Sequence, residues 1–236
     1  GQGNNMFRKV CIIFQLIISI GIIFCSIIMV KQLHYLRNTD IGIERKNIAS
    51  ISIYPYSEKY KQTLTQMPEV TDILTEHGSL LPYRSRISYH IEDWSDKKEN
   101  DQSISLEVVC GTESLAQFYN LTLLKGEMIH DSDLSGQVLI NEAAAKAFGW
   151  NDPIGKSIIQ PKDVYQVKGL IKDTYNASPT TPVNPTLYLS PEKYKQLFYN
   201  SPQDIIFKYK EGSWTTIKKH LESVKKEMKG TYTYIY

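Results

Sequence analysis

The 236-residue sequence has few cysteines and almost no net charge. Two of its three cysteines, Cys11 and Cys25, lie in a long apolar run, which leaves Cys110 alone in the rest of the chain. One thiol cannot form a disulfide within a domain, so we expect the hydrophobic core to hold the fold together. The formal net charge is +2 and the lysines and arginines form no large cluster, which argues against a nucleic-acid partner.

The sequence also lacks metal-ligating and catalytic motifs. None of the five histidines has the helical i, i+4 spacing or the neighbouring Cys/His pattern of a zinc site. The acidic residues after His130 lack the later glutamate of a calcium loop. No Gly-x-Ser-x-Gly turn, which would expose a serine nucleophile, is present. We therefore expect no catalytic, cofactor-binding or metal-binding residues, and no enzymatic activity of the chain itself.

Charge is absent from the whole segment between Val10 and Val30. As a helix, these 21 residues would cover about 31 Å at 1.5 Å per residue, which is about the hydrocarbon thickness of a bilayer. Arg8 and Lys9 precede the segment, which favours a cytoplasmic N-terminus and a following domain on the outer side. The sequence thus predicts a transmembrane helix from Val10 to Val30.

Two other interpretations of this segment are less favourable. A signal peptide usually has an apolar region of about 7–15 residues followed by a small-residue cleavage site. This segment is longer, and "MVKQLHYL" at its end offers no such site. A buried helix of a soluble protein is rarely uncharged over this length.

A stalk is expected beyond the membrane. Met29, Leu33 and Leu36 continue the helical apolar spacing past Val30, and we expect the helix to continue to about Asn38, with Gly42 beyond it. Residues 1–46 are therefore predicted to form the transmembrane helix and its stalk.

The rest of the chain mixes alternating strand-like segments with helical segments, for which Ser57, Ser190 and Ser213 are the expected N-caps. A turn is expected at Pro161-Lys162-Asp163, between two strand-like segments. Regular strand–helix–strand alternation is missing, which predicts the α+β class. We expect a two-lobed domain. Residues 47–111 and 187–236 would form one lobe, and residues 112–186 would form a second lobe inserted in it.

The triplet at 155–157, Gly-Lys-Ser, raises the question of a nucleotide site. A phosphate-binding P-loop reads G-x-x-x-x-G-K-[ST], follows a strand and opens a helix. Here Trp150 stands where the first glycine belongs, and Pro153 has no N–H to offer a phosphate. The preceding segment is instead predicted as a helix that Asn141 caps and Gly149 ends. With the helix before the loop, we predict a structural turn rather than an ATP site.

Two longer segments resemble MacB/FtsX-type ABC transporter permeases. "VLINEAAAKAFGWNDPIGKSI" is similar to the family's N-E-A-A-x-K-x-x-G-x-x-x-P-I-G-K pattern. "YQVKGLIKDTYNASPTTPVNPTLYL" resembles the strand, the Lys-Asp pair and the proline-containing return that follow it. The matching residues, for which we expect structural roles, are Asn141, Glu142, Gly149, Pro153, Gly155, Lys156, Lys172 and Asp173. The N-terminal helix looks like the one that leads into the second extracytoplasmic domain of long, duplicated members.

The resemblance implies a membrane-proximal, porter-like lobe with an inserted second lobe. It implies that a cytoplasmic ABC ATPase subunit or domain hydrolyses ATP and that motion passes along the membrane helices to the outer domain. That domain would act on a periplasmic substrate or partner protein, in efflux, lipoprotein release or cell-envelope regulation. The chain would lie in the inner (cytoplasmic) membrane, with the part after residue 30 in the periplasm or outside the cell.

The C-terminal segment departs from the family pattern. "KGTYTYIY" lacks the proline expected before the aromatic tail, and no further membrane helices follow. We therefore expect the chain to be part of a longer permease that works with the rest of the polypeptide or with a second copy.

Two other functional classes remain open on the sequence. A sensor ectodomain would also follow an outward-going helix, but it needs a ligand cavity and a second membrane helix leading to a signalling domain. A membrane-anchored hydrolase needs a nucleophile and a base that meet in a cleft.

Overall fold

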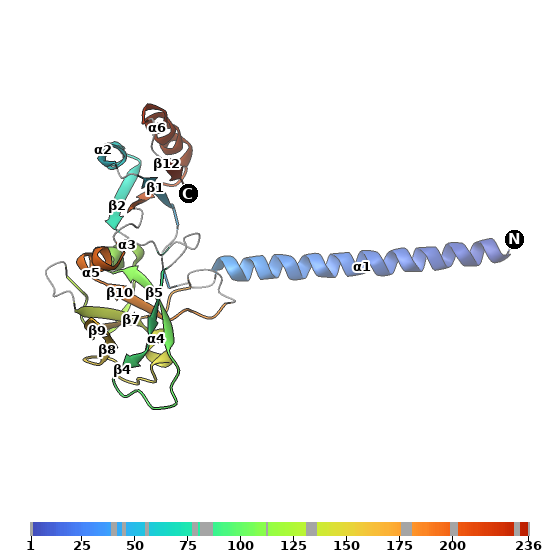
Figure 1. Ribbon diagram of the computed structural model, residues 1–236. Coiled ribbons are helices and arrows are strands. Elements are labelled where there is room, and N and C mark those ends of the chain that lie inside the picture. Colours follow the sequence, from blue (N-terminus) through green and yellow to red (C-terminus); the bar gives the residue numbers. More distant parts are fainter. Residues whose placement is uncertain are drawn as a thin grey trace. The chain divides into compact units, whose positions relative to one another are not determined.

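The structure is a computed structural model of the chain (Figure 1). It describes residues 2–38, 42–43, 46–54, 57–76, 80, 87–111, 113–130, 136–175, 181–198, 203–228 and 232–235. The chain divides into two compact units: residues 1–40 with 178–180, and residues 41–177 with 181–236. Helices and strands are mixed in the second unit, which confirms the α+β class.

The first unit contains one long helix, α1 (Gln2–Asn38). Its segment Met6–Leu36 has a mean hydropathy of 2.7 in its most apolar window and is long and apolar enough to cross a membrane. All of the described side chains of this segment are exposed. The helix contains the predicted span Val10–Val30 and continues without a break to Asn38, as the apolar spacing beyond Val30 predicted.

The second unit contains a four-stranded antiparallel sheet. Its strand order is β12 (Tyr232–Ile235), β1 (Ile48–Tyr54), β11 (Gln203–Tyr209) and β2 (Val70–Glu76). Alternate residues of β1 point into one core cluster, as expected for a strand with one face against helices. That cluster includes Ile51 and Phe207 of the sheet, Tyr60 of helix α2 (Glu58–Thr65) and Leu221 of helix α6 (Trp214–Glu227).

Of the N-caps predicted for these two helices, one is present and the other is absent. Ser57 has an extended backbone and its side chain accepts a hydrogen bond from the Lys59 N–H at 3.3 Å, so its cap is confirmed. Ser213 precedes α6 but makes no side-chain capping bond, so the predicted cap is wrong. Its backbone is helical rather than extended, and its hydroxyl donates to the Lys210 carbonyl instead.

The second unit also contains an eight-stranded mixed sheet. Its order is β3 (Ile87–Ile91), β5 (Ile104–Cys110), β10 (Thr186–Leu189), β7 (Gln137–Asn141), β9 (Asp163–Ile171), β8 (Ser157–Gln160) and β4 (Asp93–Trp94), and β6 (Leu123–Gly126) also pairs with β9. The pairs β5–β10 and β7–β9 are parallel. Its associated helices are α3 (Glu113–Tyr119), α4 (Glu142–Ala147) and α5 (Pro191–Leu197).

Both faces of the eight-stranded sheet are buried around β7. Val138 and Ile140 belong to one core cluster, and Leu139 between them belongs to another. The second cluster also contains Leu74 and Ile206 of the four-stranded sheet, so apolar contacts join the two sheets. A strand that is buried on both faces has consecutive apolar residues, which explains the run Val138 to Ile140 in β7.

The strand pairing differs from the expected division of the chain. Strands β3, β4 and β5, and β10 apart from its first residue Thr186, lie outside residues 112–186, yet they pair in the same sheet as β7 and β9. The four-stranded sheet draws only on residues 48–76 and 203–235 among those described. Local apolar patterns predicted the strands but carried no information about their partners. The two-lobe division therefore stays a proposal.

Candidate functional site

The residues of the family pattern meet where β7 ends and α4 begins. Asn141 is the last residue of β7 and caps α4: its Oδ1 accepts from the Ala144 N–H at 3.0 Å. The same oxygen accepts from the Thr186 N–H at 2.8 Å, and Nδ2 donates to the Asn184 carbonyl at 3.0 Å. The predicted cap is thus confirmed. The additional bonds to the start of β10 were not predicted, because a cap pattern reports only on its own helix.

Glu142 and Asp173 hold the start of α4 to the end of β9. The Asp173 carboxylate accepts from the Ala143 N–H at 2.9 Å, and the Glu142 carboxylate accepts from the Asp173 N–H at 3.0 Å. Strands β7 and β9 are parallel, and Asn141 is registered with Ile171. Their following residues therefore emerge side by side, which allows two hydrogen bonds in opposite directions.

Asp173 is partly desolvated in this position. Burial raises the pKa of its carboxyl above the usual value, and the nearby charge of Glu142 raises it further. The hydrogen bonds from the backbone and the charge of Lys146 act in the opposite direction. Its neighbour Lys172 donates its backbone N–H to the Thr122 carbonyl at 2.9 Å, so the Lys-Asp pair ties β9 to two different segments.

Gly42, which follows α1 closely in the sequence, packs against the same corner. Its φ is +76°, and a Cβ at this position would lie 2.5 Å from the Asp173 carbonyl oxygen and 3.2 Å from the Thr174 Cα. Only glycine fits such a conformation and such a close approach. The next residue, Ile43, is buried in the cluster that joins the two sheets. From the sequence Gly42 was expected only to lie beyond the stalk, and this contact was not predicted.

The Gly-Lys-Ser triplet follows helix α4 and ends at the first residue of β8, as predicted. Gly149 has φ +74°, which confirms the left-handed position after the helix. Gly155 also has a positive φ, and its N–H donates to the Val167 carbonyl at 2.8 Å. Pro153 is buried in the same turn. The order of helix and loop is therefore the reverse of that in a P-loop.

Lys156, the lysine of the triplet, forms an ion pair. The Lys156 ammonium contacts the Asp96 carboxylate in the turn after β4. In the same place, the Ser157 N–H donates to Ser95 Oγ at 2.9 Å, and the Trp150 indole N–H donates to the Ser95 carbonyl at 2.9 Å. These contacts hold Lys156, Ser157 and Trp150 against the turn that follows β4.

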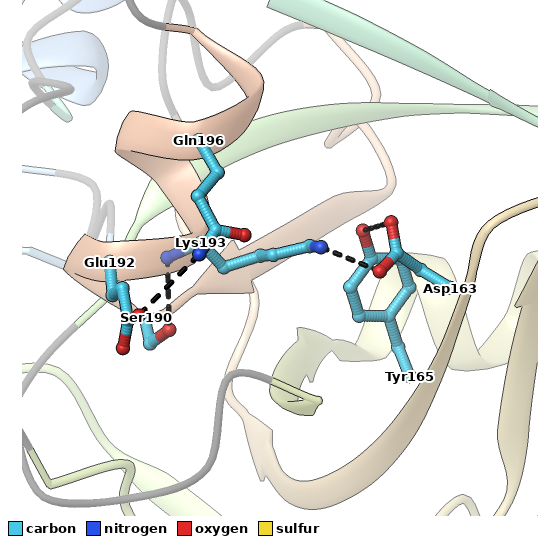
Figure 2. A network of polar contacts seen from close by, with 6 residues as sticks. All are labelled: Asp163, Tyr165, Ser190, Glu192, Lys193 and Gln196. Atoms are coloured by element: carbon cyan, nitrogen blue, oxygen red, sulfur yellow. Dashed lines mark hydrogen bonds and ion pairs between the residues drawn. The ribbon is translucent and has the colours of Figure 1, made fainter.

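A second polar cluster lies between α5 and the hairpin of β8 and β9 (Figure 2). Lys193 is buried, and its ammonium lies 2.6 Å from an Asp163 carboxylate oxygen. The Tyr165 hydroxyl lies 3.5 Å from the other oxygen, and the ammonium lies 5.7 Å from the centre of the Tyr165 ring. Burial, together with the neighbouring Tyr89, raises the pKa of Tyr165.

This cluster was not predicted from the sequence. Asp163 was predicted as a turn residue, and Lys193 stood in an amphipathic helix where a lysine is usually solvated. Ser190 does cap that helix, as predicted, because its Oγ accepts from the Lys193 N–H at 3.4 Å. Among the described residues, no group of three or more His, Cys, Asp and Glu side chains could hold a metal ion.

Comparison with known proteins shows which family these features belong to. The sequence profile of the MacB-like periplasmic core domain matches residues 12–224. No curated protein sequence matches the chain. The crystal structure of the periplasmic region of MacB from Actinobacillus actinomycetemcomitans has a TM-score of 0.54 at 18% identity, covering 82% of this chain and 89% of that one. A domain described as a permease protein from Porphyromonas gingivalis has a TM-score of 0.53 at 13% identity, covering 80% of this chain and 89% of that one.

The profile match covers most of the chain and includes part of α1, strands β1 to β11 and the corner around Asp173. At these identities, the two solved structures show a shared fold. The chain therefore belongs to the MacB-like periplasmic core domain family and is the extracytoplasmic domain of a MacB/FtsX-type ABC transporter permease.

Proposed function

We propose that this domain transmits motion from a cytoplasmic ABC ATPase to a substrate or partner protein on the outer side of the membrane. The observation that carries the proposal is the unbroken helix α1, which extends from the apolar run to Asn38. Every backbone hydrogen bond in a helix resists bending, so a helix that leaves the membrane without a break acts as a stiff connection. Met29, Leu33 and Leu36 lie in this stalk.

The corner around Asp173 would receive the motion in the folded domain. Gly42 follows α1 closely in the sequence and packs on the backbone of Asp173. Asp173 is in turn bonded to the start of α4, and Asn141 links that helix to β10. A displacement of the segment at Gly42 would therefore act directly on three elements of the eight-stranded sheet and its helix. This gives the family-pattern residues a mechanical role without chemistry.

Membrane topology follows from charge. Arg8 and Lys9 precede the apolar run, which supports a cytoplasmic N-terminus in the inner membrane and an outer location for the domain. A separate ATPase subunit or domain would supply ATP hydrolysis, because Lys156 is paired with Asp96 and the loop has the wrong order for a P-loop. The proposed roles on the outer side are efflux, lipoprotein release or cell-envelope regulation.

The two-lobe organisation is part of the proposal. Two lobes would move relative to each other during the cycle: one contains the four-stranded sheet, and the other contains the eight-stranded sheet with residues 112–186. Strands β3, β5 and β10 pair in the same sheet as β7 and β9. A lobe boundary near the four-stranded sheet therefore fits the strand pairing better than one at residue 112.

A proline in the stalk tests the proposal. Leu33→Pro removes one helical hydrogen bond and clashes with the preceding turn, at a cost of about 3 kcal/mol or more. In the full permease, we expect Leu33→Pro to keep assembly with the ATPase and ATP turnover, but to lose the transport or resistance phenotype. Leu33→Ala, matched for expression, should keep both. A Leu33→Pro protein with full outer-side activity would show that the stalk is only a tether.

A further inference from the structure

The connection between β4 and β5 is long and wholly polar. It spans residues 95–103, with the sequence SDKKENDQS, and Figure 1 shows it as an open loop that leads from β4 back to β5. Connections in compact domains have a median length of about 4–6 residues. All side chains from Lys98 to Ser103 are exposed. The loop adds no apolar side chain to a core, so hydrophobic burial does not offset the entropy lost by ordering it.

The tip of this loop is a closed turn. The Lys98 N–H donates to the Asp101 carboxylate at 2.9 Å, and the Asp101 N–H donates to the Lys98 carbonyl at 3.0 Å. These two bonds fix the backbone of the turn. Within the part of the chain that the structure describes, no hydrogen bond or ion pair is made by the side chains of Lys98, Glu99, Asn100 and Gln102. The turn therefore presents unused donors and acceptors on an ordered backbone.

The base of the loop is held by the Gly-Lys-Ser turn. The Ser95 N–H donates to the Ser157 carbonyl at 2.9 Å, and the Ser157 N–H donates to Ser95 Oγ at 2.9 Å. The Lys156 ammonium contacts the Asp96 carboxylate. Asp96 has φ +65°, a left-handed conformation that is uncommon for residues other than glycine. The ion pair and the two hydrogen bonds therefore fix the direction in which the loop leaves β4.

The composition of the loop indicates the class of partner that it fits. It contains two lysines and three acidic residues, so it offers no surface of one sign to a polyanion or a polycation. It has no aromatic or aliphatic side chain that could insert into a membrane. A folded protein can place donors, acceptors and charges of both signs opposite such a turn. Because the turn is already ordered, little backbone entropy is lost on binding.

We propose that the loop at residues 95–103 is a contact through which the domain binds a protein partner on the outer side, and that Lys156 is a positioning residue for it. Lys98, Glu99 and Asn100 touch the partner, whereas Lys156 acts through Asp96. The inference rests on the proposed function, which includes such a partner, and it names the segment that binds it. Lys156 of the family pattern thereby has a role in recognition as well as in the fold.

A charge exchange at the tip tests the contact. Lys98→Glu combined with Glu99→Lys, in the full permease, keeps the net charge of the loop and the backbone bonds of the turn. We expect the transport or resistance phenotype to fall by about 10-fold or more, with ATPase assembly and ATP turnover unchanged. Lys218→Glu combined with Glu222→Lys exchanges two exposed charges of α6 and should keep the phenotype. Full activity of the tip exchange would overturn the contact.

Photo-cross-linking in living cells tests the class of partner. The full permease would carry p-benzoylphenylalanine in place of Asn100. We expect a covalent adduct with a different polypeptide, and much less of it when the tip charges are exchanged. The absence of an adduct, an adduct of lipid size, an adduct with a second copy of this chain, or a yield that the charge exchange leaves unchanged would overturn the proposal.

Limited trypsin digestion of the full permease tests the positioning role. Lys156→Met removes the ion pair, and we expect cleavage after Lys97 and Lys98 to become about 10-fold faster or more and the phenotype to fall. Lys156→Arg keeps the charge and should restore both. Lys168→Met removes a different ion pair, with Glu127 at 3.9 Å, and should change neither. Unchanged cleavage of the loop in Lys156→Met would overturn the role of Lys156.

The outcomes separate this contact from the proposed transmission of motion. If Leu33→Pro abolishes the outer-side activity and the tip charge exchange does not, the loop contact alone is contradicted. If the tip charge exchange abolishes the activity and Leu33→Pro does not, the loop contact stands and the stalk is only a tether.

Discussion

Gly42 lies against the backbone carbonyl of Asp173, so closely that a Cβ on Gly42 would come within 2.5 Å of the oxygen. This contact connects the segment that follows α1 in the sequence to the corner where β9 ends and α4 begins.

We expect Gly42→Ala to destabilise the domain by about 2 kcal/mol or more, because both a positive φ and a backbone clash oppose the new methyl group. Gly212→Ala is a matched control, since Gly212 has φ +83° but open space around its Cβ position. It should cost only the conformational part, about 1 kcal/mol. Urea unfolding of the two variants measures the difference, and equal losses would contradict the close packing at Gly42.

The domain should fold without the membrane helix, and its stability should depend on the residue at which the shortened chain begins. Both a chain beginning at Asn47 and one beginning at Ile41 should unfold cooperatively in a thermal scan followed by circular dichroism. The longer one retains Ile43, which is 8% exposed, and should be more stable by about 1.5–3 kcal/mol. A missing transition in both would show that the domain depends on α1.

Asp173 should make the stability depend on pH. Its pKa is raised in the folded state, so the folded protein holds this proton more tightly than the unfolded chain does. The contribution of Asp173 to stability should therefore grow as the pH falls through its folded pKa towards the ordinary value near 3.8, and be lost as the pH rises again. Unfolding free energies between pH 7 and about 4 should show this component in the wild type and not in Asp173→Asn. If the unfolding free energies of the wild type and Asp173→Asn changed equally with pH, the raised pKa of Asp173 would be contradicted.

Removing the buried ammonium should weaken the contact between α5 and β9. Lys193→Met keeps the aliphatic stem but leaves the Asp163 carboxylate unpaired, which should cost about 1–3 kcal/mol. Lys195→Met, on the exposed side of the same helix, should stay within about 0.5 kcal/mol of the wild type. Similar values for both variants would mean that the ion pair only offsets its own desolvation.

The Gly-Lys-Ser turn should bind no nucleotide. Calorimetric titration of the outer domain with Mg-ATP should give no saturable heat, because Lys156 is paired with Asp96 and the loop follows its helix. Micromolar binding that Lys156→Ala abolishes would contradict the structural role of the turn.

Local features of the fold were predictable because they depend on neighbours within a few residues. The helix from the apolar run to Asn38, the caps by Asn141 and Ser190, and the left-handed Gly149 all follow from spacing, side-chain chemistry or backbone freedom at one point of the chain. The match to the family pattern likewise depends on a continuous segment. Ser213 is an exception: serine is a favoured N-cap residue, but the helical backbone of Ser213 keeps its side chain from capping α6.

Only the tertiary structure decided which segments meet. Strands β5 and β10 pair in one sheet although β6, β7, β8 and β9 lie between them in the sequence. Gly42 reaches Asp173, and Lys193 reaches Asp163, by the same folding of distant segments onto each other. Strand patterns and lone charged residues carry no information about such partners, because many pairings bury equivalent apolar surface. The choice among them depends on the packing of the whole core.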